Sequence, residues 1–257
     1  MRIVLGWTLV DEGKNSRARE VFNDMGESAY FGALGQLQIA KLESRLGNHD
    51  AARAAFDIVE TSGVAPQEYT LARARFEASS GDREAAIARL QSVISNNGRA
   101  DIGPAGDYLR RLEDGKRLPR LSEKAQAARA LTEPAFGFFV RNNSADGAET
   151  FLRFARWIDP DYDQSALWLG GLIEETHPDM GEEMRQDVLA LYQSIDERSS
   201  YYVNARMSKA NLYFDKEDDE QALVILEDLA ESHPSYFTRE VLGRARFFRE
   251  NWEGALP

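Results

Sequence analysis

The sequence has no cysteine among its 257 residues, and it has only three histidines and eight prolines. Without cysteine, a disulfide framework, a thiolate zinc site and a cysteine nucleophile are all excluded. No apolar run approaches the roughly 18 residues that a membrane-spanning helix needs. Hydrophobic residues make up 43% of the chain, which is too many for wholesale disorder. A globular chain of one or two domains remains.

Positive charge is also scarce, and it is unevenly distributed. The net charge is -12, yet residues 1–130 carry 19 Lys and Arg against 18 Asp and Glu, whereas residues 131–257 carry 12 against 25. The most basic stretch, residues 110–129, is interleaved with acidic residues and has only Tyr108 beside it as an aromatic. Nucleic-acid surfaces combine denser positive charge with stacking groups. We therefore predict no nucleic-acid partner.

A repeat of constant period runs through the N-terminal part of the chain. Glycines at 13, 47 and 81 are evenly spaced and mark three successive copies. Each copy has a small residue before the glycine, and an alanine followed by a bulky apolar residue after it. These three sets are Gly6, Ala40 and Ala74, then Ala18, Ala52 and Ala86, then Phe22, Phe56 and Leu90.

The C-terminal part shows the same spacing with more interruptions. Ala210, Ala222, Leu226 and Pro234 form one copy, and a further copy follows, with its small residue at Gly243 and its alanine at Ala255. Gly170 opens another copy, whose second helix is delayed by about six residues within the stretch 174–186. The second half of one more copy consists of Ala148, Leu152, Ala155 and Pro160.

The residue types in the repeat describe two helices that approach closely. Small residues on facing helices allow close contact, and a bulky residue four positions later lies on the same face. Pro160 and Pro234 end the second helices. These residues resemble the tetratricopeptide repeat (TPR), a helix–turn–helix unit of about 34 residues. The resemblance implies an all-α fold, a right-handed superhelical solenoid of antiparallel helix pairs.

Residues 98–130 do not fit the repeat register. Glycines and prolines punctuate this stretch, and we predict a short helix at Asp107–Asp114, a loop at 115–120 and a helix at Ser122–Ala130. The predicted domains are an N-terminal array of residues 1–97, this irregular helical connector, and a C-terminal array of residues 131–257. Neither end carries the polar cap that repeat arrays require, so we expect a window of a longer repeat protein that self-associates through its uncapped ends. The alternative is a natural short protein with frayed ends.

Motifs for chemistry are missing from the sequence. The histidines are isolated, and no nucleophile elbow, phosphate-binding loop or dinucleotide fingerprint occurs. The acidic run at residues 215–220 lacks the glycine that a calcium loop uses for its bend, so a solvated turn at a helix start is expected there. We predict no catalytic residue, no metal and no cofactor.

The resemblance also implies a place to look for a ligand. In chaperone-binding members of the TPR family, a clamp of Lys, Asn and Arg holds a terminal carboxylate. The corresponding positions here include Ile3, Gln38, Ala72 and Ser208, which supply no cation. A chaperone C-terminus is therefore not the expected ligand.

The remaining candidate is the inner surface formed by the first helix of each pair. A mixed apolar and charged surface of this kind suits an extended peptide or a partner helix, although some of its residues can instead pack between neighbouring units. The predicted function is a non-catalytic protein–protein interaction scaffold. Its predicted contact residues are Lys41, Arg45, Arg75, Asn204, Met207, Asn211, Phe214 and Arg244.

An alternative function comes from a different class of protein. The chain can be the substrate-recruiting arm of a larger enzyme, for example a glycosyltransferase or a peptidase, with a catalytic domain outside these residues. The sequence is also similar to the long multi-repeat TPR proteins of Gram-negative bacteria. That similarity leaves two compartments open, the cytoplasm and the cell envelope.

Overall fold

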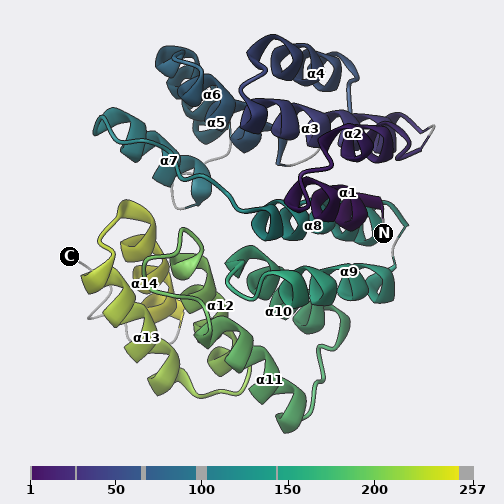
Figure 1. The fold of residues 1–257 in the computed structure, drawn as a ribbon. Coiled ribbons are helices and arrows are strands. Elements are labelled where there is room, and N and C mark those ends of the chain that lie inside the picture. Colours follow the sequence, from purple (N-terminus) through teal and green to yellow (C-terminus); the bar gives the residue numbers. More distant parts are fainter. Residues whose placement is uncertain (1, 27, 65–67, 97–102, 143, 249–257) are drawn as a thin grey trace. The chain divides into compact units, whose positions relative to one another are not determined.

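The computed structural model describes residues 2–26, 28–64, 68–96, 103–142 and 144–248, and these form fourteen α-helices without a strand (Figure 1). The first seven helices are α1 (Arg2–Asp11), α2 (Asn15–Asn23), α3 (Ala29–Leu46), α4 (His49–Thr61), α5 (Tyr69–Ser79), α6 (Arg83–Asn96) and α7 (Pro104–Glu113). The other seven are α8 (Glu123–Asn142), α9 (Ala145–Ile158), α10 (Asp163–Thr176), α11 (Glu182–Gln193), α12 (Tyr202–Phe214), α13 (Asp219–Ser232) and α14 (Tyr236–Phe248).

Most helices pack as pairs of sequence neighbours, as the repeat predicts. The pairs are α1 with α2, α3 with α4, α5 with α6, α8 with α9, α10 with α11, and α12 with α13. First helices of successive pairs also touch, as α3 and α5 do in one place and α10 and α12 in another. The prediction of an all-α solenoid of helix pairs is confirmed for the described residues.

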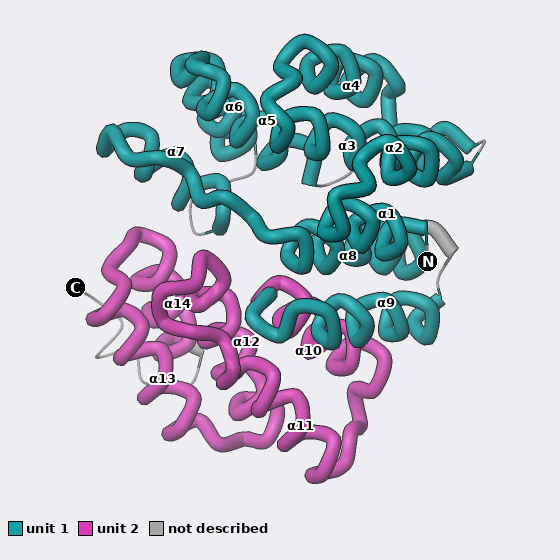
Figure 2. The backbone as a smooth tube through the Cα atoms, viewed as in Figure 1, with its two compact units in different colours: residues 1–162 teal, residues 163–257 magenta. Residues whose placement is uncertain are grey.

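The chain divides into two compact units, Met1–Tyr162 (unit 1) and Asp163–Pro257 (unit 2), shown in different colours in Figure 2. Unit 1 holds α1 to α9, and unit 2 holds α10 to α14. The boundary between the two units differs from the boundaries near residues 97 and 130 that the repeat register predicts. The reason is that α8, after a stretch without helix at residues 114–122, packs on α1 and carries α9 with it.

The small residues of the repeat lie where helices come closest. Ala40, Ala74 and Ala210 of the first helices are fully buried, and so are Ala18, Ala52, Ala86 and Ala222 of the second helices. A Cβ atom at Gly6 would overlap the ring of Phe22, which is itself fully buried. The predicted pairing of small and bulky residues is therefore confirmed here, while Ala255 lies outside the described residues.

The delayed second helix after Gly170 is α11. It begins at Glu182, within the stretch 174–186, and runs to Gln193. Val188 and Tyr192 take the repeat positions about six residues late, as the sequence predicts. The first helix of this pair, α10, continues to Thr176. Tyr192 of α11 fills the space beside Gly170, where a Cβ atom would come within 2.6 Å of its ring.

The connector differs from its prediction at one helix. The short helix is present as α7, but α8 continues well beyond the predicted end at Ala130, through Pro134 to Asn142. Tertiary packing rather than local propensity stabilises most helices, and beyond Ala130 α8 continues to pack on α9, where Phe138 stacks on Phe151 with 5.5 Å between the ring centroids. Both sides of α8 are also packed nearer its start. Ala127 and Ala130 pack in the core with α1, while Ala128 and Leu131 pack in the core with α9.

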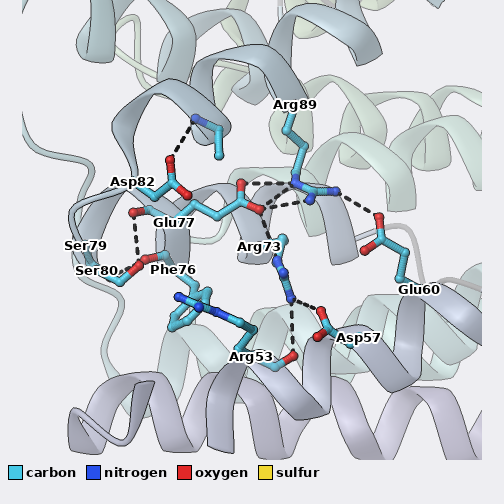
Figure 3. Close-up of polar contacts among 11 residues, drawn as sticks. Arg53, Asp57, Glu60, Arg73, Phe76, Glu77, Ser79, Ser80, Asp82 and Arg89 are labelled. Atoms are coloured by element: carbon cyan, nitrogen blue, oxygen red, sulfur yellow. Dashed lines mark hydrogen bonds and ion pairs between the residues drawn. The ribbon is translucent and has the colours of Figure 1, made fainter. Parts of the chain in front are cut away.

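Ion pairs join neighbouring helices of unit 1 at an equivalent position of two repeats. Glu43 and Glu77 occupy the same position in successive repeats, and both are buried. The carboxylate of Glu43 pairs with Arg19 of α2. That of Glu77 accepts from Nε of Arg73 at 3.0 Å and from Nη2 of Arg89 at 2.9 Å (Figure 3). A buried glutamate in each of these repeats is thus matched by arginines of its own or an adjacent helix.

Arg73 lies at the centre of this network between aromatic rings. Its guanidinium carbon is 5.2 Å from the ring centroid of Phe56 and 5.8 Å from that of Phe76. Nη1 of Arg73 also contacts Oδ1 of Asp57 in α4 at 2.9 Å (Figure 3). Stacking on two rings together with ion pairs holds α4 against α5.

Candidate partner-binding surface

One position of the repeat allows a direct comparison of the inner surfaces of the two units. We call it the face position, and it is the residue that follows the small residue of each first helix. In unit 1 the face positions are Trp7, Lys41 and Arg75, and in unit 2 they are Gly171, Asn211 and Arg244. Three of the eight predicted contact residues, Lys41, Arg45 and Arg75, lie in unit 1, and the other five lie in unit 2.

In unit 1 the charged face positions share one buried carboxylate. Glu68, directly before α5, pairs with the ammonium of Lys41 through Oε2 and with Nη2 of Arg75 at 2.9 Å through Oε1. The side chain of Lys41 is only 2% exposed and that of Glu68 only 7%. Burial by itself would raise the pKa of Glu68, but the charges of Lys41, Arg75 and Arg129 lower it to about 2. Charges that are removed from water in this way are stable only when they are paired.

Further polar groups complete this cluster. Nη1 of Arg75 donates to the hydroxyl of Tyr108 in α7 at 3.0 Å. The backbone N–H of Glu68 donates to Oε1 of Glu133 in α8 at 2.6 Å. Arg129 of α8 lies over the ring of Tyr162, with 4.6 Å between its guanidinium carbon and the ring centroid. The cluster therefore links α3, α5, α7 and α8 within unit 1.

The helix α8 covers the first helices of unit 1. At its start, Glu123 pairs with Arg45 at the end of α3. Further along, the backbone oxygen of Glu133 accepts a hydrogen bond of 2.8 Å from the hydroxyl of Tyr30, at the start of α3. The order of these contacts shows that α8 runs antiparallel to α3. Figure 1 shows α8 alongside α1, on which it packs.

Small apolar residues form the contact between α8 and α1. Trp7 is 1% exposed, and it shares a core cluster with Ala127 and Ala130 of α8. Its indole Nε1 donates to Oε1 of the buried Gln38 at 3.1 Å. The inner surface of unit 1 is therefore filled by a helix of the same unit, and Lys41 and Arg75 contact internal partners there.

The five predicted contact residues in unit 2 have different surroundings. Asn211 and Arg244 are exposed, and Nη2 of Arg244 pairs with Oε1 of Glu240 one turn earlier at 2.7 Å. Asn204 is half-buried. Met207 and Phe214 are half-buried as well, and they pack against the core cluster of Ala210, Ala222, Ile225 and Leu226. The exposed members of this set are thus two face positions.

Two adjacent glycines in α10 show which side of the helix is open. A Cβ atom at Gly170 would meet Tyr192, whereas one at Gly171 would have no neighbouring atom within 4 Å. Gly171 is also exposed. The face positions of unit 2 are therefore all exposed, in contrast with the buried Trp7 and Lys41 of unit 1.

Sequence reasoning missed Glu133, Arg129 and Tyr162, which take part in the cluster of unit 1. These residues lie beyond or at the end of the predicted connector, where the repeat register gives no alignment. The available signal is the apolar spacing in α8, with Ala127 and Ala130 on one face and Ala128 and Leu131 on the next. That spacing indicates a helix buried on two sides, although it does not say against which helices.

The described residues offer neither a metal-binding cluster nor a membrane-spanning helix. Among them, no three His, Asp or Glu side chains are grouped so that they could hold a metal ion. None of the described helices combines the length and the apolar character that crossing a bilayer requires. The acidic turn at residues 215–220 instead begins α13, since Oδ1 of Asp218 accepts from the backbone N–H of Gln221 at 3.2 Å.

Helix pairs that recur at a constant spacing, with small residues buried between the two helices, identify the type of repeat. The chain is a TPR-like helical repeat protein. No protein-family model matches the sequence, and no curated protein matches it either.

Solved structures of helical repeat proteins are similar to this chain at low identity. The thermophilic TPR protein TTC0263 from Thermus thermophilus is 16% identical, with 84% of this chain and 99% of that chain covered and a TM-score of 0.38. The C-terminal part of a TPR repeat-containing protein from Cytophaga hutchinsonii is 14% identical, with coverages of 92% and 97% and a TM-score of 0.35. The assembly chaperone Acl4 of RpL4 is 16% identical, with coverages of 98% and 97% and a TM-score of 0.37. None of the three assigns a partner to this chain.

Proposed function

We propose that this chain is a non-catalytic protein–protein interaction scaffold, and that unit 2 binds its partner on the face of α10, α12 and α14. One observation carries the proposal. At the face positions, unit 1 buries Trp7 in a cluster with α8 and Lys41 against Glu68, whereas unit 2 exposes Asn211 and Arg244. The same repeat position is thus already covered in one unit and accessible in the other.

The chemistry of the exposed face supports a protein ligand. Asn211 offers an amide that both donates and accepts hydrogen bonds, and Arg244 offers a guanidinium fork. Met207 and Phe214 add partly exposed apolar surface next to them. Polar groups for orientation beside apolar groups for burial are what a peptide or a partner helix requires. Lys41 and Arg75 are not part of this proposed surface, because Glu68 and Tyr108 already bind them.

A photo-crosslinking residue at position 211 of the 257-residue chain tests the proposal in cells that produce the protein. We expect it to label a discrete partner, and we expect the purified partner to bind the unmodified chain with a measurable Kd. The double substitution Asn211→Ala with Arg244→Ala should then weaken binding at least tenfold.

The matched control places two alanines on the outer helix of the same unit. Gln221 and Glu231 of α13 are both exposed, and Gln221→Ala with Glu231→Ala should leave the Kd unchanged. Equal losses in the two double variants, or no loss in either, would remove the face of α10, α12 and α14 from the proposal.

A further inference from the structure

The helix α8 is an example, within this chain, of a helix that packs on the first helices of a unit. It runs antiparallel to α3, and on one of its two buried faces the small residues Ala127 and Ala130 share a core cluster with Trp7. Its charge is placed to match the face, since Glu123 at its start pairs with Arg45 at the end of α3. A face of this kind therefore recognises a helix by small residues in the middle and by charge at the end.

Unit 2 carries the opposite charge at the position of Arg45. Counted from the small residue of each first helix, Arg45 corresponds to Glu175 in α10 and to Asp215 directly after α12. Both acidic residues are exposed. A cation therefore stands opposite a glutamate of α8 in unit 1, and two carboxylates stand at the same repeat position in unit 2.

The two helices that carry these carboxylates, α10 and α12, pack against each other. Burial raises the pKa of Glu174, the hydrogen bond from the hydroxyl of Tyr192 opposes this rise, and the nearby charge of Asp215 adds to it. Asp215 thus lies near Glu174, the residue directly before Glu175 in α10. Helix C-termini add partial negative charge at the same place.

Toward the middle of α10 and α12, the face leaves room for a ligand. Gly171 occupies the position that Lys41 has in unit 1, and it presents no side chain to the open space beside it. Asn211 follows at the next face position with a short polar side chain. A helix can therefore approach the backbone of α10 closely at this point, as α8 approaches Trp7 through alanines.

We infer that unit 2 binds a basic amphipathic helix of a partner protein, antiparallel to α10 and α12, with small residues over Gly171 and lysines or arginines beside Glu175 and Asp215. This inference rests on the proposed function and names the class of its partner. An acidic helix would be repelled, because unit 2 has 20 acidic against nine basic residues. Arg244, the cation at its face positions, belongs to α14, whereas the inferred helix lies along α10 and α12.

Three synthetic peptides test this inference against the 257-residue chain. Each has about 18 residues, a length of about 27 Å as a helix. The first has alanines on one face and arginines along the edge, the second has glutamates in place of the arginines, and the third is a scrambled form of the first. We expect fluorescence anisotropy to show saturable binding of the arginine helix only, at least tenfold tighter than the other two and weaker as salt is added.

Variants of the chain locate the binding surface. Gly171→Tyr fills open space, so the chain should fold as before and bind the arginine helix at least tenfold more weakly, whereas Gly171→Ala should bind it normally. Glu175→Gln with Asp215→Asn should also weaken binding tenfold. Asp187→Asn with Glu231→Gln changes the net charge equally on the exposed outer surface of α11 and α13, and it should have no such effect.

The outcomes separate this inference from the proposed function. Equal weakening by the two charge variants would show general attraction to an acidic protein, and tight binding to Gly171→Tyr would place the helix elsewhere; both results overturn the inference. If the arginine helix does not bind at all, while crosslinking at position 211 still captures a partner that the Asn211 and Arg244 substitutions release, the partner is of another class and the proposed function stands.

Discussion

Nη2 of Arg75 lies 2.9 Å from Oε1 of Glu68, and the other carboxylate oxygen of Glu68 pairs with Lys41. One buried carboxylate therefore neutralises cations of two successive repeats. Glu133 of α8 accepts from the backbone of the same Glu68 residue, so the helix that covers unit 1 is part of this arrangement. The charges of Lys41, Glu68 and Arg75 thus act in folding rather than in contacts with solvent.

Replacement of that carboxylate should destabilise the chain and change its response to acid. Glu68→Gln leaves Lys41 and Arg75 without their shared counter-charge, and we expect a loss of about 3 kcal/mol in the free energy of unfolding at pH 7. In the folded chain the pKa of Glu68 is about 2, below its ordinary value of 4.5. Because the folded pKa is the lower one, the stabilisation is complete above pH 4.5 and is lost as the pH falls toward 2.

Urea unfolding between pH 7 and pH 3 measures this effect. The gap between the original chain and Glu68→Gln should narrow as the pH falls below 4.5. Glu84→Gln, at an exposed position of α6, serves as the control and should change the unfolding free energy by less than about 0.5 kcal/mol. A gap that stays constant down to pH 3 would contradict the assignment of a strongly lowered pKa to Glu68.

The adjacent glycines of α10 should respond to alanine in opposite directions. At Gly170 the added methyl group meets the buried ring of Tyr192, and we expect a net loss of about 1–2 kcal/mol from overpacking. At Gly171 the methyl group meets nothing, so the gain in helix propensity should stabilise the chain by about 0.5–1 kcal/mol. Chemical denaturation of the two variants checks the prediction, which a shared sign of the two changes would disprove.

Docking of α8 on α1 should depend on the small size of Ala130. This residue is fully buried in the cluster with Trp7, and Ala130→Arg places a charge there without a partner. We expect α8 to leave its site and a protease to cut residues 114–122 at least tenfold faster, as followed by mass spectrometry. Ala54→Arg makes the same change at an exposed position of α4 and should leave the cleavage rate as it was.

The two acidic partners of Arg73 should differ in their contribution to stability. Glu77 is buried and binds both Arg73 and Arg89, so Glu77→Gln should cost about 3 kcal/mol. The side chain of Asp57 is 54% exposed, and Asp57→Asn should cost less than about 1 kcal/mol because water screens the pair. Thermal or urea unfolding of both variants measures the difference, and equal costs would show that burial does not decide the strength of these pairs.

Much of the local structure could be predicted from the sequence. The spacing of Gly6, Ala18 and Phe22 indicates two helices in close contact. This spacing recurs because each repeat packs its two helices together in the same way. The delay before α11 was likewise predictable in size, since Val188 and Tyr192 take the places that the pattern requires about six residues later. Because the motif occurs several times, the repeat can be identified even where one copy departs from the pattern.

The candidate surface was less predictable, and α8 shows why. The sequence by itself determined the helix pairs, the face positions and the excess of acid in the C-terminal part. Only the tertiary structure decided that α8 turns back onto α1 and that its Glu133 accepts from the backbone of Glu68, the buried partner of Lys41. The register is a local property of neighbouring residues, whereas the contact of Glu133 with Glu68 joins residues 65 positions apart, and it depends on the packing free energy of the whole unit.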